Sequence, residues 1–344
     1  MKNYFSLLLM ALGIGSCSAN DGFESVDAAT FAGVISDPDV LLLDVRTAEE
    51  YAEGRIGKAR NIDVLQSDFT ERIQALDKAK TIAVYCRSGR RSKKAADILV
   101  ENGFKVVELS TGYNGWKERY PYPVEQQRTE SGKTVTISLI NHGSLCIDFN
   151  GINMQIDPVG NFYGKKIDYS AFPKADYIFI THEHGDHLDK ATIDALTKDG
   201  TKIYLNPASQ KQLGAGEALS NGQTIAIDGI EVKAVPAYNT TPEHAQFHPR
   251  GNGNGYIFNF DGIRVYVSGD TEDIPELANL KDIDIAFLSA NQPYTMTPEQ
   301  CIKAAKTIKP RILIPYHLGE TDMQQIAAGL KDLGIDVRLQ ETMR

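Results

Sequence analysis

The sequence contains few cysteines, with only four among its 344 residues. Such a low number excludes a small scaffold held together by disulfide bonds, and it also excludes a zinc module built from cysteine ligands. Positive charge is scarce as well, because 36 basic residues stand against 45 acidic residues and the net charge is −9. A chain with this charge is poorly suited to binding phosphate backbones, so we expect no nucleic acid partner.

The overall composition is typical of a soluble globular protein, with 42% hydrophobic and 24% charged residues. It excludes both wholesale disorder and a polytopic membrane protein. The sequence has no internal repeat and no low-complexity tract. At roughly 150 residues per domain, the length predicts two domains.

The N-terminus has the pattern of a secretion signal. An apolar run over residues 4–14 is followed by two small residues and Cys17, and the run is too short to span a bilayer as a permanent helix. The segment before Cys17 resembles the lipobox of bacterial lipoproteins. This resemblance implies removal of residues 1–16, lipidation of Cys17 and a membrane-anchored protein of the bacterial cell envelope, facing the periplasm or the surface. An ordinary cleaved signal peptide is the alternative.

Residues 25–124 predict a small α/β domain. Continuous apolar runs at 40–43, 81–85 and 105–108 alternate with helical patterns, and this alternation is typical of a parallel sheet covered on both faces. The polar stretch 125–132 has no period, so we expect a linker there.

Residues 133–344 predict a second domain of a different kind. Its first part holds strand-like runs at 134–140, 145–149 and 152–156, and the turn signals between them favour antiparallel hairpins. Helical patterns follow later and alternate with further strands. The simplest architecture is a strand-rich sandwich flanked by helices.

Cys86 lies in the first of two candidate sites, between a buried strand and a helix that begins near Ser92. The carboxyl end of a parallel strand is where ligands usually bind. Backbone N–H groups of the loop and nearby arginines favour a thiolate, which is nucleophilic and can carry a persulfide. A buried structural cysteine is the alternative. The expected anion-binding loop consists of Arg87, Ser88, Gly89, Arg90, Arg91 and Ser92.

The first domain resembles the rhodanese family over about 100 residues. The resemblance rests on the stretch 43–62, on the loop 86–92 and on the segment 112–116. It implies that Cys86 takes a sulfane sulfur from a donor and passes it to a thiol acceptor, with the loop amides and Arg91 stabilising the persulfide. A sulfur carrier or binding module without turnover is the alternative.

A dense group of histidines forms the second candidate site. His182, His184, Asp186 and His187 lie within six residues, directly after the apolar strand 177–180. Imidazole and carboxylate are ligands that zinc and similar metals prefer, whereas apolar packing cannot use them. His182 and His184 can face one metal, and Asp186 and His187 can reach a second.

Further ligands follow other predicted strands. Asp270 comes after the strand 264–267 and can bridge two cations, and His317 follows another apolar strand. Three other histidines remain available as ligands or substrate contacts, namely His142, His244 and His248.

The second domain resembles the metallo-β-lactamase superfamily, in particular its L-ascorbate-6-phosphate lactonase-like branch. This resemblance, carried by 181–187 and by segments such as 141–144 and 235–239, implies an αββα sandwich with metals at one edge. Either His244 or His248 is implied as a ligand, and we prefer His248. His142 is either near the metals, in contact with substrate, or structural. The implied ligand set is His182, His184 and His248 for one metal and Asp186, His187 and His317 for the other, with Asp270 between them.

The sequence therefore predicts an enzyme that uses two divalent ions, zinc or manganese, to hydrolyse a small ester, lactone, amide or phosphoester. Asp186 is expected to orient the attacking hydroxide or to carry a proton to the leaving group. The rival hypothesis is a persulfide dioxygenase with a single iron, which a rhodanese neighbour would suit. Cys146 and Cys301 are expected to be inert core residues.

Overall fold

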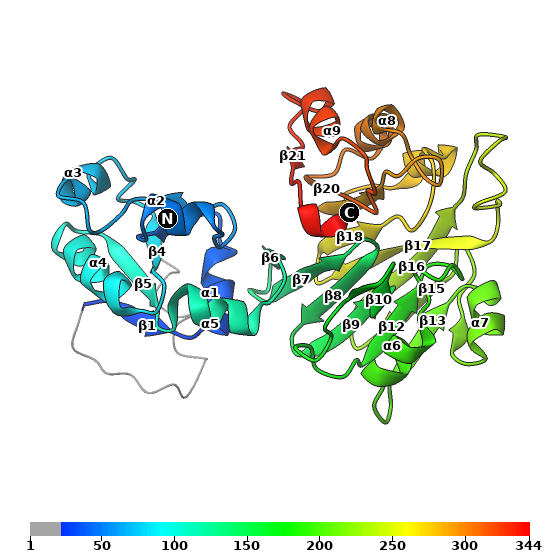
Figure 1. Cartoon of the computed structure of the whole chain (residues 1–344), viewed down its shortest axis with the longest axis horizontal. Coiled ribbons are helices and arrows are strands. Elements are labelled where there is room, and N and C mark those ends of the chain that lie inside the picture. Colours follow the sequence, from blue (N-terminus) through cyan, green and yellow to red (C-terminus); the bar gives the residue numbers. More distant parts are fainter. Residues whose placement is uncertain (1–21) are drawn as a thin grey trace. The chain divides into compact units, whose positions relative to one another are not determined.

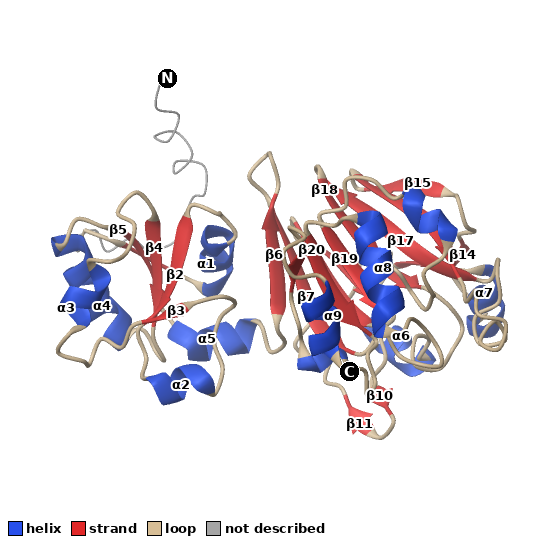
Figure 2. Cartoon of the chain, turned by 90° about the horizontal axis from the view of Figure 1, so that it is seen from above, coloured by secondary structure: helices blue, strands red, loops and turns tan. Residues whose placement is uncertain are grey.

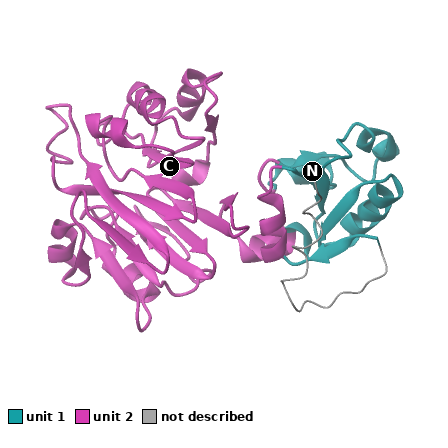
Figure 3. Cartoon of the chain, turned by 180° about the vertical axis from the view of Figure 1, so that it is seen from behind, with its two compact units in different colours: residues 1–27, 39–55, 59–113 teal, residues 28–38, 56–58, 114–344 magenta. Residues whose placement is uncertain are grey.

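The computed structural model describes residues 22–344. The expected signal peptide (1–16) and Cys17 lie outside these residues. The chain divides into two compact units, coloured separately in Figure 3: one holds the described residues up to 27 together with 39–55 and 59–113, and the other holds 28–38, 56–58 and 114–344. This division differs from the expected boundary at residue 124, because residues 28–38, 56–58 and 114–124 of the first predicted domain group with the second unit.

A five-stranded sheet in the order β1-β5-β4-β2-β3 organises the N-terminal part, and all of its strand pairs are parallel. Leu43, Ile82 and Val84 are fully buried in its core. The predicted parallel α/β architecture is confirmed. The strands are β1 (Glu24–Val26), β2 (Val40–Asp44), β3 (Arg60–Asn61), β4 (Thr81–Tyr85) and β5 (Lys105–Leu109).

Helices connect these strands. Helix α4 is amphipathic and buries Ala95, Ala96 and Leu99 against the sheet, while its lysines stay in solvent. Near the end of the domain, Trp116 packs edge-on against Phe31. The helices are α1 (Ala28–Ile35), α2 (Ala48–Ala52), α3 (Phe69–Ile73), α4 (Arg90–Glu101) and α5 (Gly112–Arg119).

Two seven-stranded sheets form the larger unit. The first has the order β14-β13-β12-β9-β8-β7-β6, and the second runs from β15 to β21 in chain order. The expected antiparallel hairpins are present, since β8 pairs antiparallel with both β7 and β9. The first sheet contains β6 (Val124–Arg128), β7 (Thr134–Asn141), β8 (Ser144–Phe149), β9 (Ile152–Ile156), β12 (Tyr177–Ile180), β13 (Lys202–Leu205) and β14 (Glu217–Ala218). The second contains β15 (Thr224–Ile227), β16 (Ile230–Ala237), β17 (Gly253–Phe260), β18 (Ile263–Val267), β19 (Ile285–Ser289), β20 (Ile312–Tyr316) and β21 (Asp336–Val337).

The two sheets share one apolar core, in which Phe179 of the first sheet meets Phe258 of the second edge-on. Helices cover the outer faces, with α6 beside the first sheet and α8 and α9 beside the second (Figure 1). The predicted αββα sandwich is confirmed. The remaining elements are α6 (Lys190–Leu196), α7 (Pro207–Leu213), α8 (Pro298–Ile308), α9 (Met323–Gly329), the short hairpin β10 (Asn161–Phe162) and β11 (Lys165–Lys166), and the 3-10 turns η1 (Pro275–Asn279) and η2 (Glu341–Met343).

Part of the expected linker 125–132 is a strand. Residues Val124–Arg128 form β6, which pairs antiparallel with β7 at the edge of the first sheet (Figure 2). The segment has no apolar period because an edge strand needs few apolar side chains. Its buried Glu125 forms an ion pair with Arg338.

Helices of the described segment, 22–344, are all too short or too polar to traverse a lipid bilayer. Cys146 in β8 and Cys301 in α8 are buried, as expected for inert core cysteines. Burial raises the pKa of each thiol to about 12, so both stay neutral and unreactive at physiological pH.

Candidate metal centre and cysteine loop

The histidine loop 181–187 leaves the end of β12 and is held in place by Asp157, which follows β9. The backbone N–H and the hydroxyl of Thr181 donate to the Asp157 carboxylate at 2.8 and 2.6 Å. Farther along, the N–H groups of His187 and Leu188 both donate to the carbonyl of His184, at 3.0 and 2.8 Å. These bonds fold the loop into a tight turn that gathers its imidazoles on one side.

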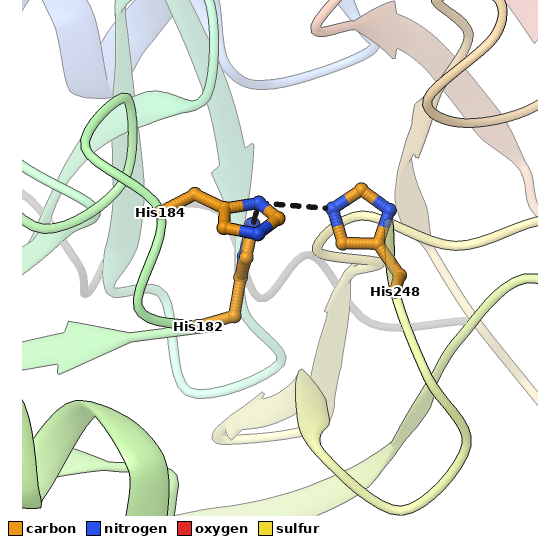
Figure 4. Close-up of side chains that lie close together, drawn as sticks. All are labelled: His182, His184 and His248. Carbon is orange, nitrogen blue, oxygen red and sulfur yellow. Dashed lines mark hydrogen bonds between the residues drawn. The ribbon is translucent and has the colours of Figure 1, made fainter. Parts of the chain in front are cut away.

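Three histidines meet at the first candidate metal position. Nε2 of His182 lies 3.0 Å from Nδ1 of His184, and Nε2 of His248 lies 3.2 Å from the same atom. Figure 4 shows the three rings turned toward one another. Their ligand nitrogens all lie within 4.8 Å of one another, and Nδ1 of His248 lies 2.9 Å from the carbonyl oxygen of Tyr294, which leaves Nε2 to face the cluster.

His244 lies outside this cluster. Its Nδ1 is 3.2 Å from the carboxylate of Glu272, which also accepts hydrogen bonds from the backbone N–H groups of Thr240 and Thr241. The preceding turn is therefore anchored by Glu272, and the chain then brings His248 to the other histidines.

Asp270 occupies the centre of the site, at the end of β18, and is almost fully buried. One carboxylate oxygen, Oδ1, lies 3.4 Å from Nε2 of His187. The other, Oδ2, lies 3.3 Å from Nε2 of His248 and 3.2 Å from Nε2 of His317. Oδ2 thus lies between His248 and His317 while Oδ1 faces His187, so the carboxylate is placed where it could bridge two ions.

A second group contains Asp186, His317 and also His142. Oδ2 of Asp186 lies 3.4 Å from Nε2 of His317, 3.5 Å from Nε2 of His142 and 4.0 Å from Nε2 of His187. His142 and His317 both have a positive φ, 49° and 50°, and the N–H of His317 donates to the carbonyl of His142. Strained backbone of this kind concentrates at functional sites, and here it places both rings beside Asp186.

The charges of the site depend on one another. Burial lowers the pKa of His182 well below its usual value, and it lowers the pKa of His142 to about 4. Burial opposes the charge of His187 too, but the carboxylates of Asp270, Asp157 and Asp186 outweigh it and raise its pKa well above the usual value. Burial also opposes the charge of Asp270, yet His317 and His187 hold the pKa of this carboxyl well below its usual range. Metal ligands must be neutral imidazoles and ionised carboxylates, so His182 and Asp270 already favour their binding forms, whereas His187 would release its proton on binding metal.

The donor atoms fit divalent metal ions. Nε2 of His187, Nε2 of His317 and Oδ1 of Asp270 are buried and have no hydrogen-bond partner within the described segment. Leaving buried polar atoms unpaired is costly, and an unsatisfied cluster of this kind demands an explanation. A nitrogen and oxygen donor set is what zinc or manganese prefers.

Asp157 supports the histidine loop from behind, and the sequence analysis assigned no role to it. Its Oδ2 lies 2.7 Å from Nδ1 of His187, and both residues are fully buried. A carboxylate behind a ligating imidazole fixes its tautomer and its orientation. The available signal was position, because Asp157 directly follows a predicted strand just as Asp270 does.

The cysteine loop lies at the end of β4, as predicted. Cys86 is buried and Gly89, with φ of 90°, begins α4. A Cβ on Gly89 would come within 2.2 Å of the carbonyl oxygen of Ser110, so only glycine fits. The N–H of Tyr113 donates to the carbonyl of Cys86 at 2.7 Å, which ties the loop to the start of α5.

The arginines of this loop have different environments. Arg87 and Arg90 are exposed, whereas Arg91 forms two hydrogen bonds of 2.7 Å to the Glu50 carboxylate. Ser88 is exposed, and Ser92 is buried against Cys86. Arg91, which the resemblance implies as a stabiliser of the persulfide, is thus held by Glu50, whose negative charge offsets part of its positive charge.

Two known domains match the chain. The Beta-lactamase superfamily domain matches residues 136–317, and the Rhodanese-like domain matches residues 27–119. The latter range covers Cys86 and its loop, and the former covers all the metal-cluster residues named above.

Similar proteins match the larger unit. A UPF0173 metal-dependent hydrolase of Thermococcus kodakarensis is 31% identical over 192 residues, which cover 53% of this chain and 84% of the relative. One of Methanopyrus kandleri is 28% identical over 219 residues, covering 59% of this chain and 94% of the relative. A crystal structure of a protein described as a metal-dependent hydrolase from Parabacteroides distasonis is 52% identical, covers 64% of this chain and 99% of its own, and has a TM-score of 0.62.

Proposed function

Because this chain belongs to the Beta-lactamase superfamily and is a metal-dependent hydrolase with a rhodanese-like domain, we propose that it hydrolyses a small ester, lactone, amide or phosphoester with two divalent ions. The observation that carries this proposal is the position of Asp270. Its Oδ2 lies 3.3 Å from Nε2 of His248 and 3.2 Å from Nε2 of His317, and its Oδ1 lies 3.4 Å from Nε2 of His187. This one buried carboxylate therefore contacts histidines of both proposed ligand groups, which suits a pair of ions sharing it.

We assign the ligands as follows. His182, His184 and His248 would hold the first ion, and Asp186, His187 and His317 would hold the second, with Asp270 contacting both groups of ligands. His142 is a further candidate ligand of the second ion. Its Nε2 lies 3.5 Å from Oδ2 of Asp186, which is close to the 3.4 Å between Nε2 of His317 and the same oxygen. Zinc is the metal that this donor set favours, and manganese is compatible with it.

Bound ions of this kind activate a water molecule and polarise the scissile carbonyl or phosphoryl oxygen. The residues of the chain supply the rest of the chemistry. Asp186 is one-quarter exposed while the other carboxylate of the cluster, Asp270, is buried, so Asp186 is the carboxylate that a substrate can reach. Its role is to orient the attacking water and to carry a proton to the leaving group.

Elemental analysis of protein purified without added metal tests the proposal. We expect about two zinc or manganese ions per chain, by the logic of two-metal hydrolases. His317→Ala is expected to lower the metal content and to abolish hydrolysis of generic ester or phosphodiester substrates. His244→Ala is the matched control, because this histidine lies outside the cluster, and it should retain both ions.

The same elemental analysis distinguishes the hydrolase from the rival hypothesis, a persulfide dioxygenase. A persulfide dioxygenase would hold a single iron with two histidines and an aspartate, leaving positions open for oxygen and sulfur. One bound iron, together with oxygen uptake that depends on glutathione persulfide, would establish the dioxygenase in place of the hydrolase.

A second activity is favoured by Cys86, which lies between a parallel strand and a helix N-terminus in a loop closed by Gly89 and Tyr113. We propose that the Cys86 thiolate attacks the outer sulfur of a small donor such as thiosulfate, which breaks the donor S–S bond, releases sulfite and forms a persulfide. An acceptor thiolate then attacks the outer sulfur of this persulfide and releases the Cys86 thiolate. Intact mass after treatment with thiosulfate should show one added sulfur on the wild type and none on Cys86→Ser. Sulfur loading without release to any thiol would favour a carrier without turnover.

We also propose that the mature protein is anchored to the bacterial cell envelope through acylation of Cys17. The support is the sequence before this residue, which lies outside the described residues. Two or more acyl chains give stable attachment, so Cys17→Ala should move the protein from the membrane fraction to the soluble fraction. If this variant stays in the membrane fraction, Cys17 does not anchor the protein.

A further inference from the structure

The segment 341–344 lies against the metal centre, although neither proposed activity assigns it a role. It begins with the turn η2, and the side chain of Met343 is fully buried in the core that the two sheets share. Two of its backbone carbonyls accept hydrogen bonds from other loops. The N–H of His142 donates to the carbonyl of Thr342 at 3.2 Å, and the N–H of Leu318 donates to the carbonyl of Met343 at 3.1 Å. One short segment therefore binds two separate loops of the metal centre.

The backbone of His142 and His317 needs such support, because both residues have a positive φ, 49° and 50°. Left-handed backbone is costly for a residue with a Cβ, and it persists only where the surrounding contacts fix it. The carbonyl of His142 accepts from the N–H of His317 at 3.2 Å, which joins the two residues to each other. The bonds to Thr342 and Met343 then hold this pair from outside, one on each loop.

Arg344 holds the turn that follows His317. Its Nη1 donates to the carbonyl oxygens of Gly319 and Thr321 at 3.0 and 3.1 Å. Its Nε donates to a carboxylate oxygen of Glu341 at 2.6 Å, so the guanidinium is oriented by its own segment. The N–H groups of a guanidinium point in fixed directions, and one that binds two carbonyls restricts both of them. Arg344 therefore limits the movement of the turn in which His317 stands.

The contacts of this segment are selective. Within residues 22–344, no hydrogen bond joins it to the loops that carry the ligands of the first ion, His182, His184 and His248. By contrast, Nε2 of His142 and Nε2 of His317 lie 3.5 and 3.4 Å from Oδ2 of Asp186. We propose that the segment 341–344 is a positioning element for the second ion, which turns the rings of His142 and His317 toward Asp186. The inference rests on the two-ion site of the proposed function.

Titration of the metal-free full chain with Co²⁺ tests this inference, because Co²⁺ accepts the same nitrogen and oxygen donors. The wild type should bind two ions in two steps, and the step that His317→Ala removes identifies the second ion. Arg344→Gln should weaken that step about tenfold, the size expected for losing hydrogen bonds from a charged group, and leave the other step unchanged. Loss of a positive charge alone would strengthen cation binding, so weaker binding reports lost geometry.

Arg311→Gln is the matched control. It removes an exposed arginine that directly precedes β20, whereas His317 directly follows this strand, and it should leave both steps unchanged. Removal of residues 341–344 is a stronger change and should abolish the second step while the first persists. If this shortened chain does not fold, Arg344→Gln, whose side chain is more than one-third exposed, still gives the answer.

An unchanged second step in Arg344→Gln overturns the inference. Equal weakening of both steps also overturns it, because a merely structural role of the segment would loosen the whole centre. A wild type that binds one ion contradicts the proposed function, and the inference fails with it. A wild type that binds two ions, with the same affinities in Arg344→Gln, contradicts the inference alone, so the two failures are distinguished.

Discussion

Glu50 shows how one side chain can tie the cysteine loop to its domain. It lies in α2, and its carboxylate takes both hydrogen bonds from the guanidinium of Arg91. These bonds lower the pKa of Glu50 to about 2, against the ordinary value of 4.5. The fork geometry restricts Arg91 to one orientation beside Cys86.

The Glu50 pair makes the domain sensitive to acid. Because the pKa of Glu50 is lower in the folded protein, the pair stabilises the fold fully above pH 4.5 and this contribution is lost as pH falls toward 2. We expect the pair to contribute about 1–2 kcal/mol, less than the full pKa shift would give, because its side chains are one-fifth exposed and solvent screens them.

Urea unfolding of Glu50→Gln at pH 7 and at pH 3 measures this contribution. The variant should be less stable than the wild type at pH 7 and should lose less stability on acidification. Glu53→Gln, an exposed neighbour, serves as the control and should follow the wild type. Equal acid sensitivity of Glu50→Gln and the wild type would contradict the assignment.

At the scale of elements, the metal centre is built from strand ends. Asp157, the histidine loop, Asp270 and His317 follow β9, β12, β18 and β20. The sandwich brings these ends to one edge, and Asp157 links two of them by binding both Thr181 and His187. Preorganised ligands of this kind need no large rearrangement to accept metal.

Asp157→Asn tests this link between elements. The amide loses the charge that holds the His187 ring, so we expect metal affinity to fall about 10–100-fold, the range typical for losing such a partner. Competition with a fluorescent chelator measures the affinity without reference to turnover. Asp194→Asn, which removes an exposed acid of α6 that pairs with Lys190, should bind metal like the wild type. Wild-type affinity in Asp157→Asn would show that His187 does not depend on this carboxylate.

The whole molecule has two units with separate sheets and separate cores. The proposed metal ligands all belong to the larger one. Metal that binds only the folded state stabilises that state by mass action. The two units should therefore respond differently to loss of metal.

Calorimetry before and after chelation measures this difference. We expect two transitions, and removal of metal should lower the one that belongs to the larger unit by roughly 5–15 °C while the other stays constant. Adding zinc back should restore the transition of the larger unit to its original temperature. His182→Ala should respond less to the chelator than the wild type, because it lacks a proposed ligand of the first ion. A chelator that moves both transitions, or neither, would argue against a metal site confined to the larger unit.

The amino-acid sequence by itself determined the local features of this protein. Period and turn signals were enough for the parallel sheet and for a strand-rich sandwich flanked by helices, because strands and helices bury patterned faces. The αββα arrangement came from the resemblance to the metallo-β-lactamase superfamily. The histidine loop was predictable too, since four ligand residues within six positions have no use in a core. Cys86 was found by the same reasoning, from its position between strand and helix.

Only the tertiary structure decided which distant residues meet. Spacing could not choose between His244 and His248, because the choice depends on Glu272, which binds one and leaves the other free to turn inward. His142 lies beside His317 because the N–H of His317 donates to the carbonyl of His142. Ser92 lies between Glu108 and Cys86, and its Oγ contacts both side chains. The edge strand β6 was mistaken for a linker because its pairing with β7 satisfies its backbone without an apolar pattern. Such contacts depend on the positions of several chain segments at once, and no local pattern encodes them.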